Sequence, residues 1–123
     1  MEIAYWIIAG LLAALYVFAG SKKLTGSQES LQPMMAWAGT TVPMPGVRAI
    51  GLVELLGAVG LILPPAIGVA PVLALAAAAG FLVLQILALR LHLSLGESLR
   101  ESTINVVLIV GAAAAIWLST TWL

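Results

Sequence analysis

The sequence contains no cysteine, no aspartate and a single histidine, and it has few charged side chains. The absence of cysteine excludes a disulfide framework, a dithiol relay and a thiolate metal or iron–sulfur site. One histidine leaves a conventional transition-metal site short of ligands, so we expect no metal. Charged residues are 8% of the 123, against about 25% in a soluble domain, which excludes a water-facing globule. The five basic residues form no stripe that could follow a phosphate backbone, so we expect no nucleic-acid partner.

The chain is instead rich in long apolar segments, and 63% of its residues are hydrophobic. Four segments cover about residues 3–20, 49–63, 71–91 and 103–123, and each approaches the roughly 20 residues with which a helix crosses a bilayer. Pro64 and Pro65 cannot donate helical hydrogen bonds, so they are predicted to end the second segment. The sequence therefore predicts an all-α integral membrane protein. We expect one domain over residues 1–123, an antiparallel four-helix transmembrane bundle surrounded by the lipid bilayer.

Residues 27–45, between the first two spans, have a mixed composition. Polar residues alternate there with Leu31, Met34, Met35 and Trp37. This pattern predicts a short amphipathic helix in the membrane interface, with Trp37 at the depth of the headgroups. A loop that forms a lid over a site is the alternative, and the sequence does not separate the two.

The positions of the basic residues predict how the bundle is oriented. In a four-span arrangement all of them lie on one side, and the N-terminus, the Pro64–Pro65 turn and the C-terminus carry none: Lys22, Lys23, Arg48, Arg90 and Arg100. By the positive-inside rule that side is cytoplasmic, so both termini are expected outside the plasma membrane. A signal peptide has its positive charge before the apolar core, whereas here the lysines follow it, so we expect the first span to be retained.

Glu54 is the residue that stands out within the spans. It is the only ionisable side chain between Arg48 and Arg90, and it lies roughly 9 Å along a helix from Arg48. A carboxylate at such a depth costs a few kcal/mol on insertion scales, so it is normally paired or functional. Glu54 either neutralises a cation, with Lys23 or Arg90 as partner, or serves as a proton-exchanging group.

Each predicted helix contributes a polar side chain to the cytoplasmic layer around Glu54. Gln85 and His92 are seven residues apart and share one helix face, while Lys23 ends the first span and Asn105 begins the fourth. Candidate catalytic residues are Glu54, His92 and Lys23, and candidate substrate-binding residues are Gln85, Asn105 and Arg90. Structural alternatives stay open for the neutral groups: Gln85 as a hydrogen-bonding link between helices, Asn105 as a helix-start residue, His92 as an interfacial side chain. Lys22 is also explained as an anchor at the membrane surface, and Arg90 and Arg100 as determinants of membrane topology.

Four stretches resemble the DoxX-like family of small membrane proteins. They are Gly20–Leu24 after the first span, Arg48–Leu61 with its central glutamate, Ala88–Gly96 with His92, and Asn105–Leu108. The resemblance implies a four-helix membrane fold in which Lys23, Glu54 and His92 match recurring polar positions of the family. Family members are linked to quinone-dependent sulfur oxidation, to oxidative-stress membrane complexes and to assembly. This chain has no cysteine and so departs from relatives that use thiols.

These observations lead to three functional hypotheses. The first is a subunit or assembly factor of a membrane complex, for example one involved in redox or stress chemistry, with a homo-oligomer or another membrane protein as partner. The alternative is a small membrane enzyme or binder for a lipophilic molecule such as a quinone, an isoprenoid or a lipid, with Glu54 as acid or base. A proton-coupled carrier is disfavoured, because the sequence has no inverted repeat and no helix broken at the midplane.

Overall fold

The structure is a computed structural model that describes residues 1–97 and 102–123, so Arg100 lies outside the described residues. Four long helices dominate it: α1 (Glu2–Thr25), α3 (Met44–Ile67), α4 (Leu73–Ser94) and α5 (Thr103–Ser119), with a one-turn α2 (Gln28–Leu31) and a terminal 3-10 turn η1 (Thr120–Trp122). Within the described residues there is no strand beyond one isolated bridge. All four long segments, the last taken as Thr103–Trp122, are apolar enough to span a membrane. The predicted all-α membrane bundle is therefore confirmed.

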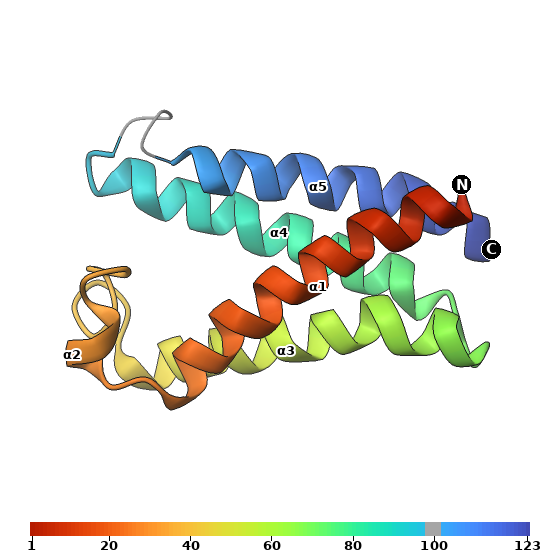
Figure 1. The fold of residues 1–123 in the computed structure, drawn as a ribbon. Coiled ribbons are helices and arrows are strands. Elements are labelled where there is room, and N and C mark those ends of the chain that lie inside the picture. Colours follow the sequence, from red (N-terminus) through yellow and green to blue (C-terminus); the bar gives the residue numbers. More distant parts are fainter. Residues whose placement is uncertain (98–101) are drawn as a thin grey trace.

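The four long helices run antiparallel in a closed ring (Figure 1). α1 packs most extensively on α3, and α4 on α5; smaller contacts between α3 and α4 and between α1 and α5 complete the ring. Both termini and the α3–α4 turn lie at one end, and α2 with its loop lies at the other (Figure 1). Many large apolar side chains, among them Ile3, Leu56 and Val110, point outward and are more than half exposed. This surface is suited to lipid, so the chain is a multi-pass membrane protein.

The prediction that Pro64 and Pro65 end the second helix was wrong. α3 continues through both prolines to Ile67 and ends at Gly68, whose φ of 71° reverses the chain. Proline at position 65 leaves the carbonyl of Leu61 without its helical N–H donor. The hydroxyl of Tyr5, on α1, donates to that carbonyl at 2.6 Å. A side chain 56 residues away in sequence therefore satisfies the carbonyl that the proline leaves open.

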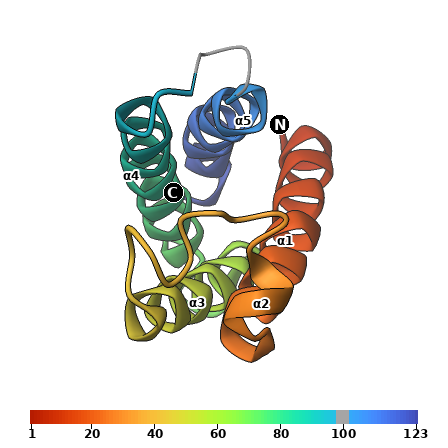
Figure 2. The same ribbon diagram turned by 90° about the vertical axis from the view of Figure 1, so that its left-hand side faces the viewer.

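The segment after α1 is helical only over the single turn of α2. A short amphipathic helix was expected from the composition of residues 27–45, and α2 is a helix of four residues within them. Leu31 and Ala38 pack with Val47 at the start of α3 as a small second core, against which Met35 and Trp37 rest. Figure 2 shows the segment crossing the end of the bundle above α3.

Candidate functional site

Glu54 is buried on α3 and paired with Lys23 on α1. Its relative exposure is 1%, and the Lys23 ammonium donates a hydrogen bond to Glu54 Oε1 within an ion pair. Of the partners that the sequence offered, Lys23 is the one the structure brings to Glu54. Arg90 is exposed on α4 and is not among the residues that line the cavities described below.

A close approach of two backbones positions this ion pair. Gly20 lies three residues before Lys23, and Gly51 lies three residues before Glu54. A Cβ at either glycine would come within 2.8 Å of the carbonyl oxygen of the other, a distance that real Cβ atoms do not adopt. The two helices can therefore approach this closely only because both residues are glycine. Because the two helices are antiparallel, Lys23 lies beside Gly51 and Glu54 lies beside Gly20, so the close approach brings the ammonium against the carboxylate.

Arg48 fixes the end of α1 that carries Lys23. Its Nη1 donates to the carbonyl oxygen of Lys23 at 2.8 Å and also to that of Gly26. These carbonyls are at the C-terminus of the helix, where they lack intrahelical donors and where a positive charge is favoured by the helix dipole. Arg48 thus has a structural role that the sequence analysis, which treated it as a marker of membrane orientation, did not identify.

Trp37, in the loop after α2, is a second side chain that contacts Lys23. The Lys23 ammonium is 5.8 Å from the centroid of the Trp37 ring, within the range of a cation–π contact. The ammonium therefore contacts both a carboxylate and an aromatic ring. Through this contact the loop becomes part of the site.

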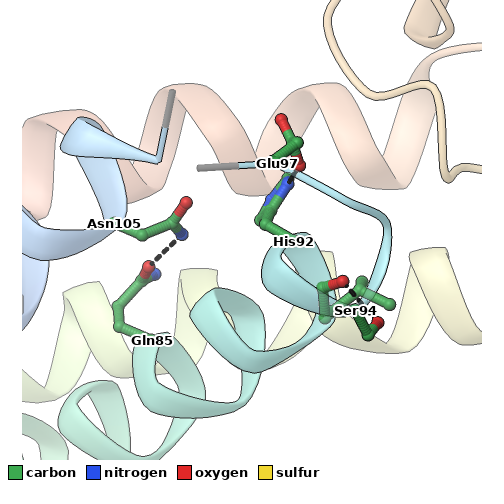
Figure 3. Close-up of polar contacts among 6 residues, drawn as sticks. Gln85, His92, Ser94, Glu97 and Asn105 are labelled. Carbon is green, nitrogen blue, oxygen red and sulfur yellow. Dashed lines mark hydrogen bonds and ion pairs between the residues drawn. The ribbon is translucent and has the colours of Figure 1, made fainter. Parts of the chain in front are cut away.

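Gln85 on α4 and Asn105 on α5 are joined by a hydrogen bond. The Asn105 amide donates to Gln85 Oε1 at 3.0 Å, and both side chains are buried (Figure 3). The structure thus gives Asn105 an interhelical role rather than that of a helix-start residue. The bond uses the oxygen of the Gln85 amide, so its N–H donors are available for another partner.

Tyr16 lies next to these polar groups, and its ring stacks on that of Phe81. Their rings stack with centroids 3.7 Å apart and planes 9° from parallel, and both side chains are buried. The Tyr16 hydroxyl lies near Gln85 and Glu54, yet it makes no hydrogen bond of normal geometry to any described residue. The sequence analysis missed Tyr16, although it lies two turns before Lys23 and hence on the same helix face.

His92, at the C-terminal end of α4, is paired with Glu97. The His92 Nδ1 and the Glu97 Oε2 are in direct contact (Figure 3). Both side chains remain partly exposed at the rim of the site. The sequence analysis did not single out Glu97. No group of three or more metal-binding side chains gathers anywhere in residues 1–97 and 102–123.

Two adjoining cavities meet at these side chains. One, of about 240 Å³, lies between α3 and α4, where Ile50, Leu84 and Leu87 form its apolar wall. The other, of about 360 Å³, lies toward α1 and α5 and is bounded by Tyr16, Asn105 and the two methionines of the loop. Six residues line both cavities: Lys23, Trp37, Glu54, Gln85, Ala88 and His92. Five of the six sequence candidates therefore gather around connected space in an apolar surrounding, and Arg90 does not.

Comparison with known proteins gives one match. A model of the family described as the DoxX-like family matches residues 7–115. No curated protein and no solved structure matches the chain.

Proposed function

This chain belongs to the DoxX-like family, and we propose that it binds a lipophilic molecule in the cavities around Glu54. The supporting observation is the cavity lining, a mostly apolar wall with a few convergent polar groups. This combination is typical of small-molecule sites, which use apolar surface for affinity and a few polar groups for orientation. Glu54 would act on the polar end of such a molecule, as acid or base where the molecule is a substrate, with Lys23 and His92 beside it.

The proposed route of entry from the bilayer is on the α3–α4 side. Leu87, which lines the smaller cavity, is 57% exposed on the surface that faces lipid. A molecule dissolved in the membrane can therefore reach the cavity between the helices. Trp37 and the loop that carries it close the same space toward the end of the bundle.

The test is whether a small molecule is retained in these cavities. The protein is extracted in native membrane discs, and lipophilic molecules are identified by mass spectrometry. Ala88→Phe fills both cavities, whereas Ala76→Phe adds the same ring on the exposed face of the same helix. We expect a molecule that is retained by the wild type and by Ala76→Phe but lost from Ala88→Phe. Identical extracts from all three proteins would contradict the proposal.

A second candidate function is that of an accessory subunit of a membrane complex or of a homo-oligomer. It is favoured by an open groove of about 380 Å³ on the outer side of α3 and α4, lined by Gly57, Gly60 and Gly80. A Cβ added to Gly80 would meet nothing within 4 Å, so a larger side chain fills the groove without strain in the monomer. Gly80→Leu is therefore expected to reduce the size of the native complex while the isolated chain stays folded. An unchanged complex size would argue against this interface.

We also propose that the end carrying Lys22, Lys23 and Arg48 is cytoplasmic and that both termini are outside the plasma membrane. The support is the absence of basic residues at the end that holds the two termini (Figure 1). Cysteines introduced as Glu2→Cys and Ser94→Cys lie at opposite ends of the bundle. An impermeant thiol reagent applied to intact cells should label only the first, and labelling of the second alone would reverse the orientation.

A further inference from the structure

The charges in the lining restrict which lipophilic molecules the proposed site accepts. Apart from the phenol of Tyr16, the charged and titratable side chains that line the two cavities are Lys23, Glu54, His92 and Glu97. They form two pairs, each of one basic and one acidic side chain: Lys23 with Glu54, and His92 with Glu97. Arg48 donates instead to backbone carbonyls. No cation among the described lining residues is thus left uncompensated for an anionic head group, and burying an unpaired carboxylate is costly.

The deep part of the larger cavity presents hydrogen-bond donors. Tyr16 is 1% exposed, and its buried hydroxyl makes no hydrogen bond of normal geometry to any described residue, although the Gln85 amide lies close to it. The N–H groups of this amide are available as donors, because its oxygen accepts from Asn105. Buried polar atoms without a partner are rare in folded proteins, so a lone hydroxyl in a cavity wall indicates a missing acceptor.

From these two observations we infer that the site selects an uncharged lipid whose head is a carbonyl or hydroxyl oxygen, with the Tyr16 hydroxyl as the donor that recognises it. The inference rests on the proposed binding function and adds the chemical class of the ligand. Tyr16 stacks on Phe81, so its ring is fixed and its hydroxyl is oriented before the ligand binds. The Lys23–Glu54 ion pair remains intact and contributes a dipole without net charge to the lining of the larger cavity.

The test uses three photoreactive probes with the same alkyl chain and different heads: a primary alcohol, a methyl ketone and a carboxylate. Each is crosslinked to the full-length protein in neutral lipid nanodiscs at pH 7, and labelled peptides are identified by mass spectrometry. We expect the alcohol and ketone probes to label the cavity residues, Leu84 or Leu87 among them, about tenfold more than the carboxylate. An excess of unlabelled decanol should compete with this labelling.

Tyr16→Phe tests the recognition step. It removes only an oxygen that makes no hydrogen bond of normal geometry to the described residues, so thermal stability should be unchanged or slightly higher. Loss of one ligand hydrogen bond should lower labelling by the alcohol and ketone probes about 2- to 10-fold. The matched control is Tyr5→Phe, which removes the other buried tyrosine hydroxyl at the far end of the bundle and should leave labelling unchanged.

The outcomes separate this inference from the proposal beneath it. Equal labelling of the cavity by all three probes, or labelling that Tyr16→Phe does not reduce, overturns the inference and leaves the binding function standing. If no probe labels the cavity of the wild type above the level in Ala88→Phe, the binding function itself is refuted.

Discussion

The Lys23–Glu54 pair allows the most direct quantitative prediction. Glu54→Gln keeps the size of the side chain and removes its charge, so the Lys23 ammonium loses its counter-ion in a place where only 12% of its side chain is exposed. Removing one member of a buried ion pair typically costs about 3–5 kcal/mol. The Trp37 ring remains 5.8 Å from the ammonium and retains part of the stabilisation, worth about 1–2 kcal/mol when desolvated. We therefore expect a loss of about 3 kcal/mol, near the lower limit.

The assay is reversible unfolding in mixed micelles with increasing mole fraction of dodecyl sulfate, followed by circular dichroism. A loss of about 3 kcal/mol is roughly a hundredfold change in the folding equilibrium, well above the error of such titrations. Glu29→Gln is the matched control, since it makes the same chemical change at an exposed position and should alter stability by less than about 0.5 kcal/mol.

The double variant Lys23→Met/Glu54→Gln distinguishes an ion pair from two independent polar groups. Replacing both charges leaves no unpaired ion, so the double variant should lose at least about 2 kcal/mol less than the sum of the single variants. A coupling energy near zero would refute the reasoning, and so would a Glu54→Gln protein as stable as the wild type. The second result would mean that Glu54 is already neutral in the folded protein.

Two further predictions concern the packing that supports the site. Tyr5→Phe should destabilise the protein by about 1 kcal/mol in the same titration, because the Leu61 carbonyl loses its donor. The effect should disappear in a Pro65→Ala background, where the N–H of residue 65 can donate to that carbonyl instead. An equal effect in both backgrounds would contradict this. Gly51→Ala should lower the free energy of unfolding by about 1–3 kcal/mol, because its Cβ would come within 2.8 Å of the α1 backbone. Gly80→Ala, with free space around it, should be neutral or slightly stabilising. Equal effects at both glycines would show that the close approach of the helices is not limiting.

The number of membrane-spanning helices and their antiparallel order could be predicted from composition. The thickness of the bilayer sets the length of an apolar segment that crosses it, and hydropathy reveals such segments directly. The ends of the helices could not be predicted in the same way. Each expected span except the last is shorter than the helix observed, and the largest difference is in α3, which was expected over 49–63 and covers Met44–Ile67. Whether a helix tolerates a proline depends on what else can serve the carbonyl left open. Here the answer is Tyr5, and nothing near Pro65 in the sequence indicates it.

The sequence predicts that the partner of Glu54 is a basic residue at the same depth. It does not distinguish Lys23 from Arg90. The structure shows the reason that the sequence alone did not supply: two glycines, Gly20 and Gly51, allow α1 and α3 to touch directly beside the two charged residues. α4 has no comparable glycine contact with α3 near Arg90, and that arginine remains exposed. Backbone contact therefore decides which of two equally charged candidates forms the pair.

Tyr16 shows the opposite case, a residue whose role depends on atoms that the sequence brings together only in three dimensions. Within an apolar span a tyrosine reads as one more large side chain, and its hydroxyl is significant only when no neighbour satisfies it. A signal was nonetheless present, because Tyr16 and Lys23 are seven residues apart and share the face of α1 that also carries Gly20. A face that combines a glycine contact, a paired ammonium and a tyrosine must point into the bundle. Its hydroxyl must then meet a donor or acceptor there, and because the protein offers none of normal geometry among the described residues, the partner is to be sought in the cavity.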